Sequence, residues 1–271
     1  MNLNDKTVVV TGGARGIGKA LGQAFSDQGA RVVIADILAE ETAETAAAIS
    51  GLAVTCDVSR EENVQHLVTA VEKTYGPIDL FCSNAGICRG EPSHSASAPN
   101  TVWQACWDIH VMAHVYAARA VLPSMLERGE GYFVQMASAA GLLSQIGDAA
   151  YSASKHATVG FAESLSITHG DDGIKISVVC PQYVATPMLG YSENEDSDQF
   201  PGVISPIELA RTVVEGIEAE KFLILPHPDV AKFIQHKTAD YDRWLGGMRK
   251  LRRNILSEIG STRLEEMHKL I

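Results

Sequence analysis

A tyrosine and a lysine spaced for proton transfer are the first feature of this sequence that could do chemistry. Tyr151 and Lys155 lie four residues apart in a segment whose pattern predicts a helix over Ala149–His169, so their side chains share one helical face. A phenol ordinarily loses its proton near pH ~10, and an adjacent ammonium lowers that pKa by about 1–3 units. Tyr151 is therefore a candidate general acid and base for a carbinol or carbonyl group. Such a pair is also common on exposed helix faces, so its meaning depends on what surrounds it.

A glycine-rich segment near the N-terminus has the composition of a phosphate-binding turn. Residues 11–18 read TGGARGIG and stand between a predicted strand, Lys6–Thr11, and a predicted helix, Gly16–Gln28. Glycine lets the backbone approach a pyrophosphate, and the start of the following helix offers unpaired N–H groups and the positive end of the helix dipole. A position between strand and helix is the context in which this pattern marks a dinucleotide site. The candidate contacts are Gly12, Arg15, Gly16, Ile17 and Gly18.

An acidic residue indicates which dinucleotide would bind. Asp36 follows the second apolar run, 18 residues after Gly18. A carboxylate there accepts hydrogen bonds from the adenosine ribose hydroxyls and repels a 2′-phosphate, which favours NAD over NADP. Ile37 supplies no positive charge for that phosphate, whereas Arg15 is a cation that could reach it. NADP therefore stays open as the less favoured cofactor.

Apolar runs and helical patterns alternate along the chain. Strands are predicted at Lys6–Thr11, Ala30–Ala35, Leu52–Cys56, Ile78–Ser83, Gly131–Met136, Lys175–Cys180 and Phe222–Leu225. Helices are predicted at Gly16–Gln28, Ala39–Ile49, Glu61–Tyr75, Asn100–Glu127 with a bend near Pro123, Ala149–His169 and Pro206–Glu218. Because the strands are continuously apolar and alternate with helices, we expect a parallel sheet buried on both faces. The expected fold class is α/β, a single doubly wound domain over residues 1–225.

Two long loops and a helical extension complete the expected layout. The loops Gly86–Pro99 and Pro187–Ser205 follow the carboxyl ends of strands, where such sheets bind ligands, and the second contains the acidic run Ser192–Asp198. Residues 226–271 lie beyond the last strand, and Val230–Leu251 reads as one helix with an apolar stripe. Since such a stripe needs a cover, we expect this extension to pack on the domain or on a neighbouring subunit.

Bulk properties exclude several classes of function. The 271 residues carry a formal net charge of −11, which argues against a nucleic-acid surface. No apolar stretch approaches the ~18 residues of a membrane span, and the polar N-terminus shows no signal peptide. The five cysteines match neither a zinc pattern nor a disulfide framework. We therefore expect a cytoplasmic protein with a small-molecule ligand and with no metal, membrane or nucleic-acid partner.

Several motifs together resemble the short-chain dehydrogenase/reductase family. They are TGGARGIG, Asp57–Val58 after the third strand, NAGI at Asn84–Ile87, Ser138, and YSASK at Tyr151–Lys155, in the family's order over roughly residues 5–225. The resemblance implies a seven-stranded Rossmann domain that binds NAD(P), and a homodimer or homotetramer. It also implies cofactor contacts for Asp57, Val58, Asn84, Ala85, Gly86, Pro181, Val184 and Thr186.

The resemblance assigns roles to the chemical residues. Ser138 would hydrogen-bond the substrate oxygen, Tyr151 would exchange the proton, and Lys155 would support Tyr151 and hold the nicotinamide ribose. His110 is a departure, because aligning residues 110–123 by their Arg-Ala-Val-Leu-Pro end places it where the family has an asparagine that holds a water near the lysine. Our hypothesis is that the imidazole takes this place in the proton relay, since it also can hold water and titrates near pH ~6.5. A buried histidine without a catalytic role is the alternative.

The expected substrate pocket is mostly apolar. Its candidate residues are Leu142, Ile146, Gln182, Tyr183 and Met188, with Gln182 as a polar contact. This composition favours an NAD-dependent oxidoreductase that interconverts a hydrophobic secondary alcohol and its ketone. The alternatives are an NADPH-dependent carbonyl reductase and a non-catalytic protein that senses dinucleotides; an interaction scaffold built on the C-terminal stripe is a further one.

Overall fold

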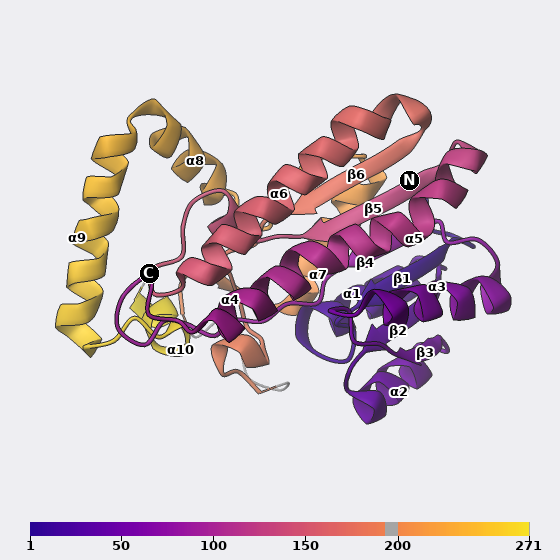
Figure 1. The fold of residues 1–271 in the computed structure, drawn as a ribbon, viewed down its shortest axis with the longest axis horizontal. Helices are drawn as coiled ribbons and strands as arrows, with labels where there is room; N and C mark the ends of the chain where they lie inside the picture. The colour runs from indigo at the N-terminus through magenta and orange to yellow at the C-terminus, as the bar shows by residue number, and fades with distance from the viewer. Residues whose placement is uncertain (193–199, 271) are drawn as a thin grey trace.

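A parallel sheet of seven strands forms the centre of the computed structural model, which describes residues 1–192 and 200–270 (Figure 1). Its order is β3-β2-β1-β4-β5-β6-β9, and every neighbouring pair is parallel. The strands are β1 (Thr7–Thr11), β2 (Arg31–Asp36), β3 (Leu52–Thr55), β4 (Leu80–Ser83), β5 (Gly131–Met136), β6 (Ile174–Val179) and β9 (Leu223–Ile224). The predicted fold class, including helices on both faces and a helical C-terminal extension, is confirmed.

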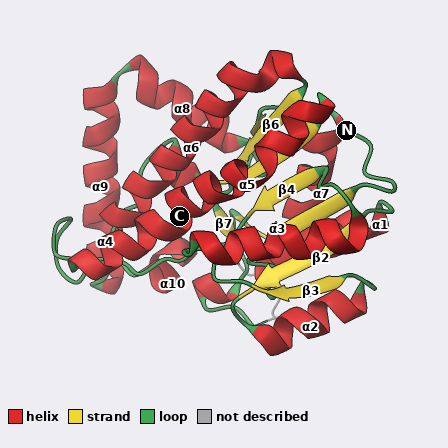
Figure 2. Ribbon diagram, turned by 45° about the vertical axis from the view of Figure 1, so that its right-hand side comes forward, coloured by secondary structure: helices red, strands yellow, loops and turns green. Residues whose placement is uncertain are grey.

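Helices bury both faces of the sheet (Figure 2). On one face lie α1 (Gly16–Asp27) and α7 (Pro206–Glu218); on the other lie α3 (Glu61–Tyr75), α5 (Ala113–Arg128) and α6 (Ala149–His169). The helix α2 (Ala39–Ala48) packs against β2 and the edge strand β3. Val8 and Val10 of β1 belong to the core under α1 and α7, whereas Val9 belongs to the core under the opposite helices. Side chains alternate between the faces of a strand, so covering both faces requires the continuous apolar runs seen in the sequence.

The order of the strands changes direction between β1 and β4. The chain passes from β1 outward to β2 and β3, and then returns to place β4 against the other side of β1. The loops after β1 and β4 therefore leave the sheet in opposite directions. In sheets of this kind the crevice between two such loops is where ligands bind.

The helix predicted over Asn100–Glu127 is interrupted before the expected bend at Pro123. It consists of α4 (Asn100–Trp107), a π-helical turn over Asp108–Met112, and α5, which continues through Pro123 to Arg128. A π-helical turn inserts an extra residue into the helical repeat and changes the direction in which the following side chains point. His110 lies inside this turn and is fully buried.

The C-terminal extension forms two helices where one was predicted. The prediction of a single helix over Val230–Leu251 was wrong, because the chain breaks at Asp240 between α8 (Asp229–Ala239) and α9 (Tyr241–Ile259). Asp240 adopts an extended conformation, and its side chain accepts a hydrogen bond from the N–H of Arg243, which caps the start of α9. Figure 1 shows α8 and α9 as an arm beside the sheet, and a short helix, α10 (Leu264–Met267), follows it.

The predicted loop after Pro187 contains regular structure. Val203 and Ile204 form β8, which pairs in parallel with β7 (Tyr183–Val184), and a 3-10 turn spans Pro187–Leu189. Apart from Ser192, the acidic run Ser192–Asp198 lies outside the described residues. Within residues 1–192 and 200–270, we find no helix with the length and apolar character that crossing a bilayer requires.

Candidate active site

The glycine loop after β1 has a shape that side chains larger than hydrogen would disturb. Gly12 has φ +63°, in the left-handed region, and a Cβ added at Gly18 would lie 2.0 Å from the carbonyl oxygen of Gly12. Asn84, at the end of β4, donates hydrogen bonds from Nδ2 to the carbonyls of Thr11 (2.9 Å) and Gly12 (3.1 Å). Asn84 thus ties the loop after β1 to the loop after β4, across the change in strand order.

The first turn of α1 fits a phosphate group. Arg15 precedes it in an extended conformation, and no side chain among the described residues caps the turn. Its N–H groups therefore have no side-chain acceptor, while the helix dipole adds positive potential at the same point. Backbone N–H groups held in this way by a glycine loop suit a pyrophosphate.

Charges at the end of β2 distinguish between two dinucleotides. The Asp36 carboxylate accepts hydrogen bonds from the N–H groups of Ala14 (3.2 Å) and Leu38 (3.3 Å), which fix it beside the glycine loop. Arg15 forms an ion pair with Glu41 of α2. Arg15, the one cation that the sequence predicted to reach a 2′-phosphate, is thus already paired with the Glu41 carboxylate.

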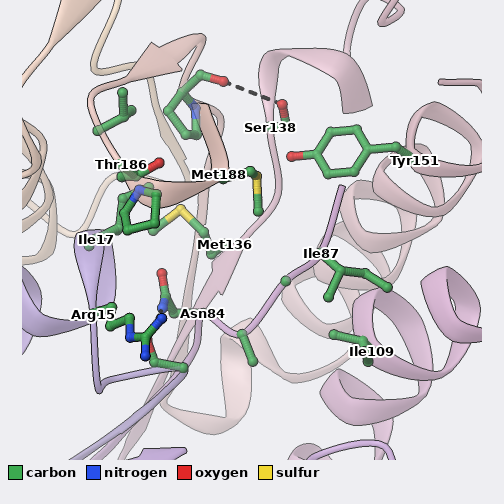
Figure 3. A pocket seen from close by; sticks show the side chains of 18 of the residues that line it. Arg15, Ile17, Asn84, Ile87, Ile109, Met136, Ser138, Tyr151, Thr186 and Met188 are labelled. Carbon is green, nitrogen blue, oxygen red and sulfur yellow. Dashed lines mark hydrogen bonds between the residues drawn. The ribbon is translucent and has the colours of Figure 1, made fainter. Parts of the chain in front are cut away.

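One cavity of about 400 Å³ collects the residues predicted to contact the cofactor (Figure 3). Its walls include Gly12, Arg15, Gly16, Ile17, Gly18, Asp36, Asp57, Val58, Asn84, Ala85, Gly86, Pro181, Val184 and Thr186, together with Ser138, Tyr151 and Lys155. The cavity runs from the glycine loop and the end of β2 to the start of α6. Its walls have the donors, the carboxylate and the apolar surfaces that a dinucleotide needs, so the residues present fit that group.

The three predicted reactive side chains meet at one end of this cavity. In Figure 3 the hydroxyls of Tyr151 and Ser138 face the same space. Ser138 donates a hydrogen bond to the carbonyl of Pro181 (3.4 Å) and accepts one from the N–H of Ala140 (3.1 Å). Lys155 is 2% exposed, donates from Nζ to the carbonyl of Met136 (2.8 Å), and places Nζ 5.7 Å from the centre of the Tyr151 ring.

Burial dominates the proton affinities of this group. It raises the pKa of Tyr151 above its usual value, while a hydrogen bond with Ser138 acts in the opposite direction. Burial also lowers the pKa of Lys155 to about 8. The expected lowering of the Tyr151 pKa by Lys155 is not seen, because Nζ is turned toward a backbone carbonyl and lies over the ring rather than at the hydroxyl.

The ring nitrogens of His110 both have protein partners. Nε2 accepts a hydrogen bond from the N–H of Ile87 (3.0 Å), so Nδ1 carries the proton and donates it to Ser154 Oγ (2.8 Å). The Ser154 hydroxyl donates in turn to the carbonyl of Tyr151 (2.9 Å). Burial first, and then the charge of Lys155, hold the pKa of His110 well below its usual value. This geometry favours a neutral imidazole that positions Tyr151 and the loop after β4 over one that holds water in a relay.

A buried carboxylate that the sequence reading missed organises the same region. Asp148 caps the start of α6, where Oδ1 accepts the N–H of Tyr151 (3.0 Å). Its Oδ2 accepts the N–H groups of Arg89 (3.2 Å) and Gly90 (2.8 Å), which lie in the loop after β4. The sequence contained a signal for this role, because an aspartate three residues before Tyr151, at the start of a predicted helix, is a typical N-cap.

The predicted substrate residues divide between two cavities. Gln182, Tyr183 and Met188 line the first cavity. Ile146 lines a second one of about 230 Å³, which we call the apolar chamber and which also has Ser138, Gln182 and Tyr183 on its walls. Leu142 lines neither of these two cavities; its partly buried side chain packs against the core under α5 and α6, and its place in a substrate pocket stays a prediction.

The apolar chamber also has walls that sequence reasoning did not predict. Phe233 of α8, three residues of α9 and Met267 of α10 contribute to it, and Leu264 of α10 reaches the first cavity. The apolar stripe of the extension predicted that one side of these helices is buried against another surface, but it did not show that this side faces the active site. No cluster of three or more histidine, cysteine or acidic side chains suited to a metal ion occurs in the part of the chain that the structure describes.

Comparison with known proteins gives this arrangement its family. A sequence model described as short chain dehydrogenase matches residues 6–197. The chain belongs to the short-chain dehydrogenase/reductase family. It is 34% identical over 235 residues to 1-deoxy-11-beta-hydroxypentalenate dehydrogenase of Streptomyces exfoliatus, covering 84% of this chain and 86% of the relative. It is 31% identical over 235 residues to epidermal retinol dehydrogenase 2 of Mus musculus, covering 83% and 75%.

A solved structure of the family has the same fold. The crystal structure of a short-chain dehydrogenase/reductase from Burkholderia phymatum in complex with NAD aligns with a TM-score of 0.81 and 26% identity, over 89% of this chain and 96% of that one. Together with the sequence relatives, it makes this protein an NAD(P)-dependent dehydrogenase of the family that acts on a CH–OH group. The glycine loop, Asn84 and the Ser138–Tyr151–Lys155 group therefore belong to a family whose members bind a dinucleotide and a small substrate.

Proposed function

We propose that this short-chain dehydrogenase uses NAD to interconvert a hydrophobic secondary alcohol and its ketone. The observation that carries the proposal is the place of Ser138, at the junction of the first cavity with the apolar chamber. A substrate oxygen at Ser138 would have the dinucleotide cavity on one side and an apolar space on the other. The names of the two sequence relatives, which denote dehydrogenases of a hydroxypentalenate and a retinol, support an alcohol as substrate.

The preference for NAD follows from the charges beside the glycine loop. The Asp36 carboxylate lines the cavity and would repel a 2′-phosphate while accepting ribose hydroxyls. Arg15 is paired with Glu41, and Ile37 is exposed and uncharged, so neither offers a free cation. The NAD in the Burkholderia phymatum structure supports the same cofactor for this chain.

The mechanism assigns one task to each polar group. When bound, the nicotinamide supplies hydride transfer. Ser138 holds the substrate oxygen by a hydrogen bond, and Tyr151 takes the hydroxyl proton during oxidation or returns it during reduction. Lys155 would hold the nicotinamide ribose, and its charge would favour the phenolate of Tyr151 if Nζ turned toward the hydroxyl. Asp148 and His110 touch no reacting atom; they fix the backbone of Tyr151 and the loop after β4.

Cofactor titration and turnover test the proposal together. NADH and NADPH are titrated by fluorescence, and kcat and KM are then measured with hydrophobic secondary alcohols and ketones. We expect NADH to bind more tightly than NADPH, and Asp36→Asn, which keeps an acceptor but removes the charge, to narrow the difference about tenfold. Tyr151→Phe should lower kcat at least ~100-fold without weakening NADH binding. Tyr116→Phe on α5, outside both cavities, is the matched control.

Two outcomes would contradict this proposal. Tighter binding of NADPH would favour an NADPH-dependent carbonyl reductase. Tight NADH binding with no turnover of any alcohol or ketone in the panel would favour a dinucleotide sensor.

We also propose a homodimer or homotetramer. Trp103 and Trp107 of α4 are large apolar side chains that remain exposed, by 37% and 46%, and Ile167 of α6 is exposed by 85%. Contact with a second copy of the chain would cover these side chains. Sedimentation should show at least a dimer, and Ile167→Arg should shift it toward the monomer.

A further inference from the structure

The apolar chamber adjoins the active site and is closed by the C-terminal arm. Four residues, Ser138, Gln145, Gln182 and Tyr183, line both the chamber and the first cavity, so the two spaces adjoin at Ser138. The opposite wall comes from α8 and α9, which lie beyond residues 6–197, the part of the chain matched by the family model. The space next to Ser138 is thus shaped in part by a segment outside that match.

The inner face of α9 is apolar, and it faces a space rather than a packed core. Trp244, Met248 and Leu251 are four and three residues apart, which places them on one side of the helix, and all three line the chamber. The other side of α9 carries the exposed charges of Arg249, Lys250, Arg252 and Arg253. An apolar helix face on an open chamber beside a reactive hydroxyl is a surface suited to an apolar ligand.

Lys237 holds this wall in place. It is 6% exposed, and its Nζ donates to the carbonyls of Leu142 (2.8 Å) and Leu143 (3.1 Å), in the segment that follows Ser138. The same Nζ lies 5.1 Å from the ring centre of Trp244 and 5.3 Å from that of Tyr241. Lys237 therefore links α8, the start of α9 and the segment after Ser138. These contacts fix the position of the helices that form the chamber wall.

Gln182 supplies a polar group at the junction of the two spaces. Its backbone N–H is bound by His227, but its side-chain amide makes no hydrogen bond with any residue in the described ranges. The residues that line the chamber include no lysine, arginine, aspartate or glutamate, and His236 of α8 is the one side chain among them that can carry a charge. A cationic ligand group would have no carboxylate partner there and an anionic one only this imidazole, so a largely apolar space favours an uncharged ligand.

We propose that the apolar chamber receives the hydrocarbon body of the substrate, an uncharged ring system larger than one six-membered ring, with Gln182 placed to hydrogen-bond a second polar group near the reacting carbon. This rests on the proposed function, because it places the reacting oxygen at Ser138. The size follows from the volume: a cavity of roughly 150 Å³ encloses one benzene ring, and the chamber offers about 230 Å³. Phe233, Trp244, Met248 and Leu251 are then residues that determine specificity.

The test measures binding without turnover. 2-Decalone, a neutral ketone with two fused rings, and cyclohexanone, with one, are titrated calorimetrically into the full-length protein saturated with NAD⁺, a combination in which no hydride can be transferred. We expect 2-decalone to bind at least tenfold more tightly than cyclohexanone, because its extra methylene groups leave water. Met248→Trp, which fills the chamber, should weaken 2-decalone binding at least tenfold. Leu245→Trp, on the same helix but outside the chamber and 41% exposed, should leave it within twofold.

Three results would overturn the inference. They are equal affinities for the two ketones, unchanged 2-decalone binding in Met248→Trp, and a change in sedimentation of Met248→Trp in place of a change in affinity, which would make the chamber wall an interface with a second copy. If Met248→Trp does not fold, Leu251→Trp fills the same face. The proposed function fails separately: 2-decalone that binds with NAD⁺ but is not reduced with NADH would refute the activity and leave the chamber assignment standing.

Discussion

Replacing Lys237 by methionine should loosen the C-terminal arm while leaving the sheet intact. Methionine keeps an unbranched apolar side chain but removes the two hydrogen bonds to Leu142 and Leu143 and the contacts with the rings of Tyr241 and Trp244. Hydrogen bonds from a charged donor are worth about 1.5–3 kcal/mol each and cation–π contacts roughly 0.5–1 kcal/mol, but the mutation also removes the penalty of burying the ammonium. We expect a net loss of about 2–4 kcal/mol in the free energy that holds α8 and α9 on the domain.

Hydrogen exchange measures this loss where it occurs. Amides of α8 and α9 that exchange by local opening should exchange about 30-fold faster for a loss of 2 kcal/mol, and several-hundred-fold faster for 4 kcal/mol, with α6 unchanged. Lys232→Met is the matched control, because Lys232 lies on the same helix but pairs with Asp229 at the exposed surface, where ion pairs contribute little. Exchange in α8 and α9 within threefold of the wild type in Lys237→Met would refute the role of Lys237.

The remaining predictions concern the first cavity. Gly18→Ala should abolish NADH binding in fluorescence titrations, because its Cβ would meet the Gly12 carbonyl, whereas Gly160→Ala in α6, with open space around it, should leave binding unchanged; equal binding by both variants would contradict the close packing of the loop. His110→Asn should keep the pH dependence of kcat/KM between pH 6 and 8, since burial holds the pKa of His110 well below its usual value of 6.5; a limb near pH 6 that disappears in the variant would support the relay hypothesis. Burial lowers the pKa of Lys155 from 10.5 to about 8, so the unfolded chain binds more protons between these values and native stability rises with pH across them. Urea unfolding should show the wild type gaining stability relative to Lys155→Met from pH 8 to 10.5, and a difference independent of pH would refute the assignment.

The fold was predictable because its strands and helices have strong local patterns. The bounds of Glu61–Tyr75, Gly131–Met136, Ala149–His169 and Pro206–Glu218 are the same in the sequence prediction and in the structure. Continuous apolar strands, alternating with amphipathic helices, leave few arrangements other than a parallel sheet covered on both faces. The motifs then placed the glycine loop, Asp36, Ser138, Tyr151 and Lys155 on the walls of one cavity.

The features that the sequence did not predict depend on contacts between residues distant in sequence, or on the backbone conformation of a single residue. Asp240 reads as an ordinary polar residue of a helix until its side chain is seen to cap α9. The apolar stripe of α8 and α9 predicted that a surface must be covered, but periodicity does not indicate whether the cover is protein or a ligand. Leu142 was expected in the pocket as part of the segment after Ser138; its partly buried side chain packs against the core, while its carbonyl accepts a hydrogen bond from Lys237.

The two cavities are lined largely by different parts of the chain, and this separation has an evolutionary consequence. The groups proposed to bind the cofactor and to move the proton lie before residue 190. Much of the wall proposed to select the substrate lies after Pro228, on helices joined to the sheet by the short connection that follows β9. Recombination at that connection could exchange one set of C-terminal helices for another. Proteins that share this chemistry could then acquire new substrates by replacing about forty residues at one end of the chain, with little change to the residues of the dinucleotide cavity. New C-terminal helices would have to supply a donor in place of Lys237 for the two carbonyls after Ser138 and a partner in place of His268 for the Tyr191 hydroxyl.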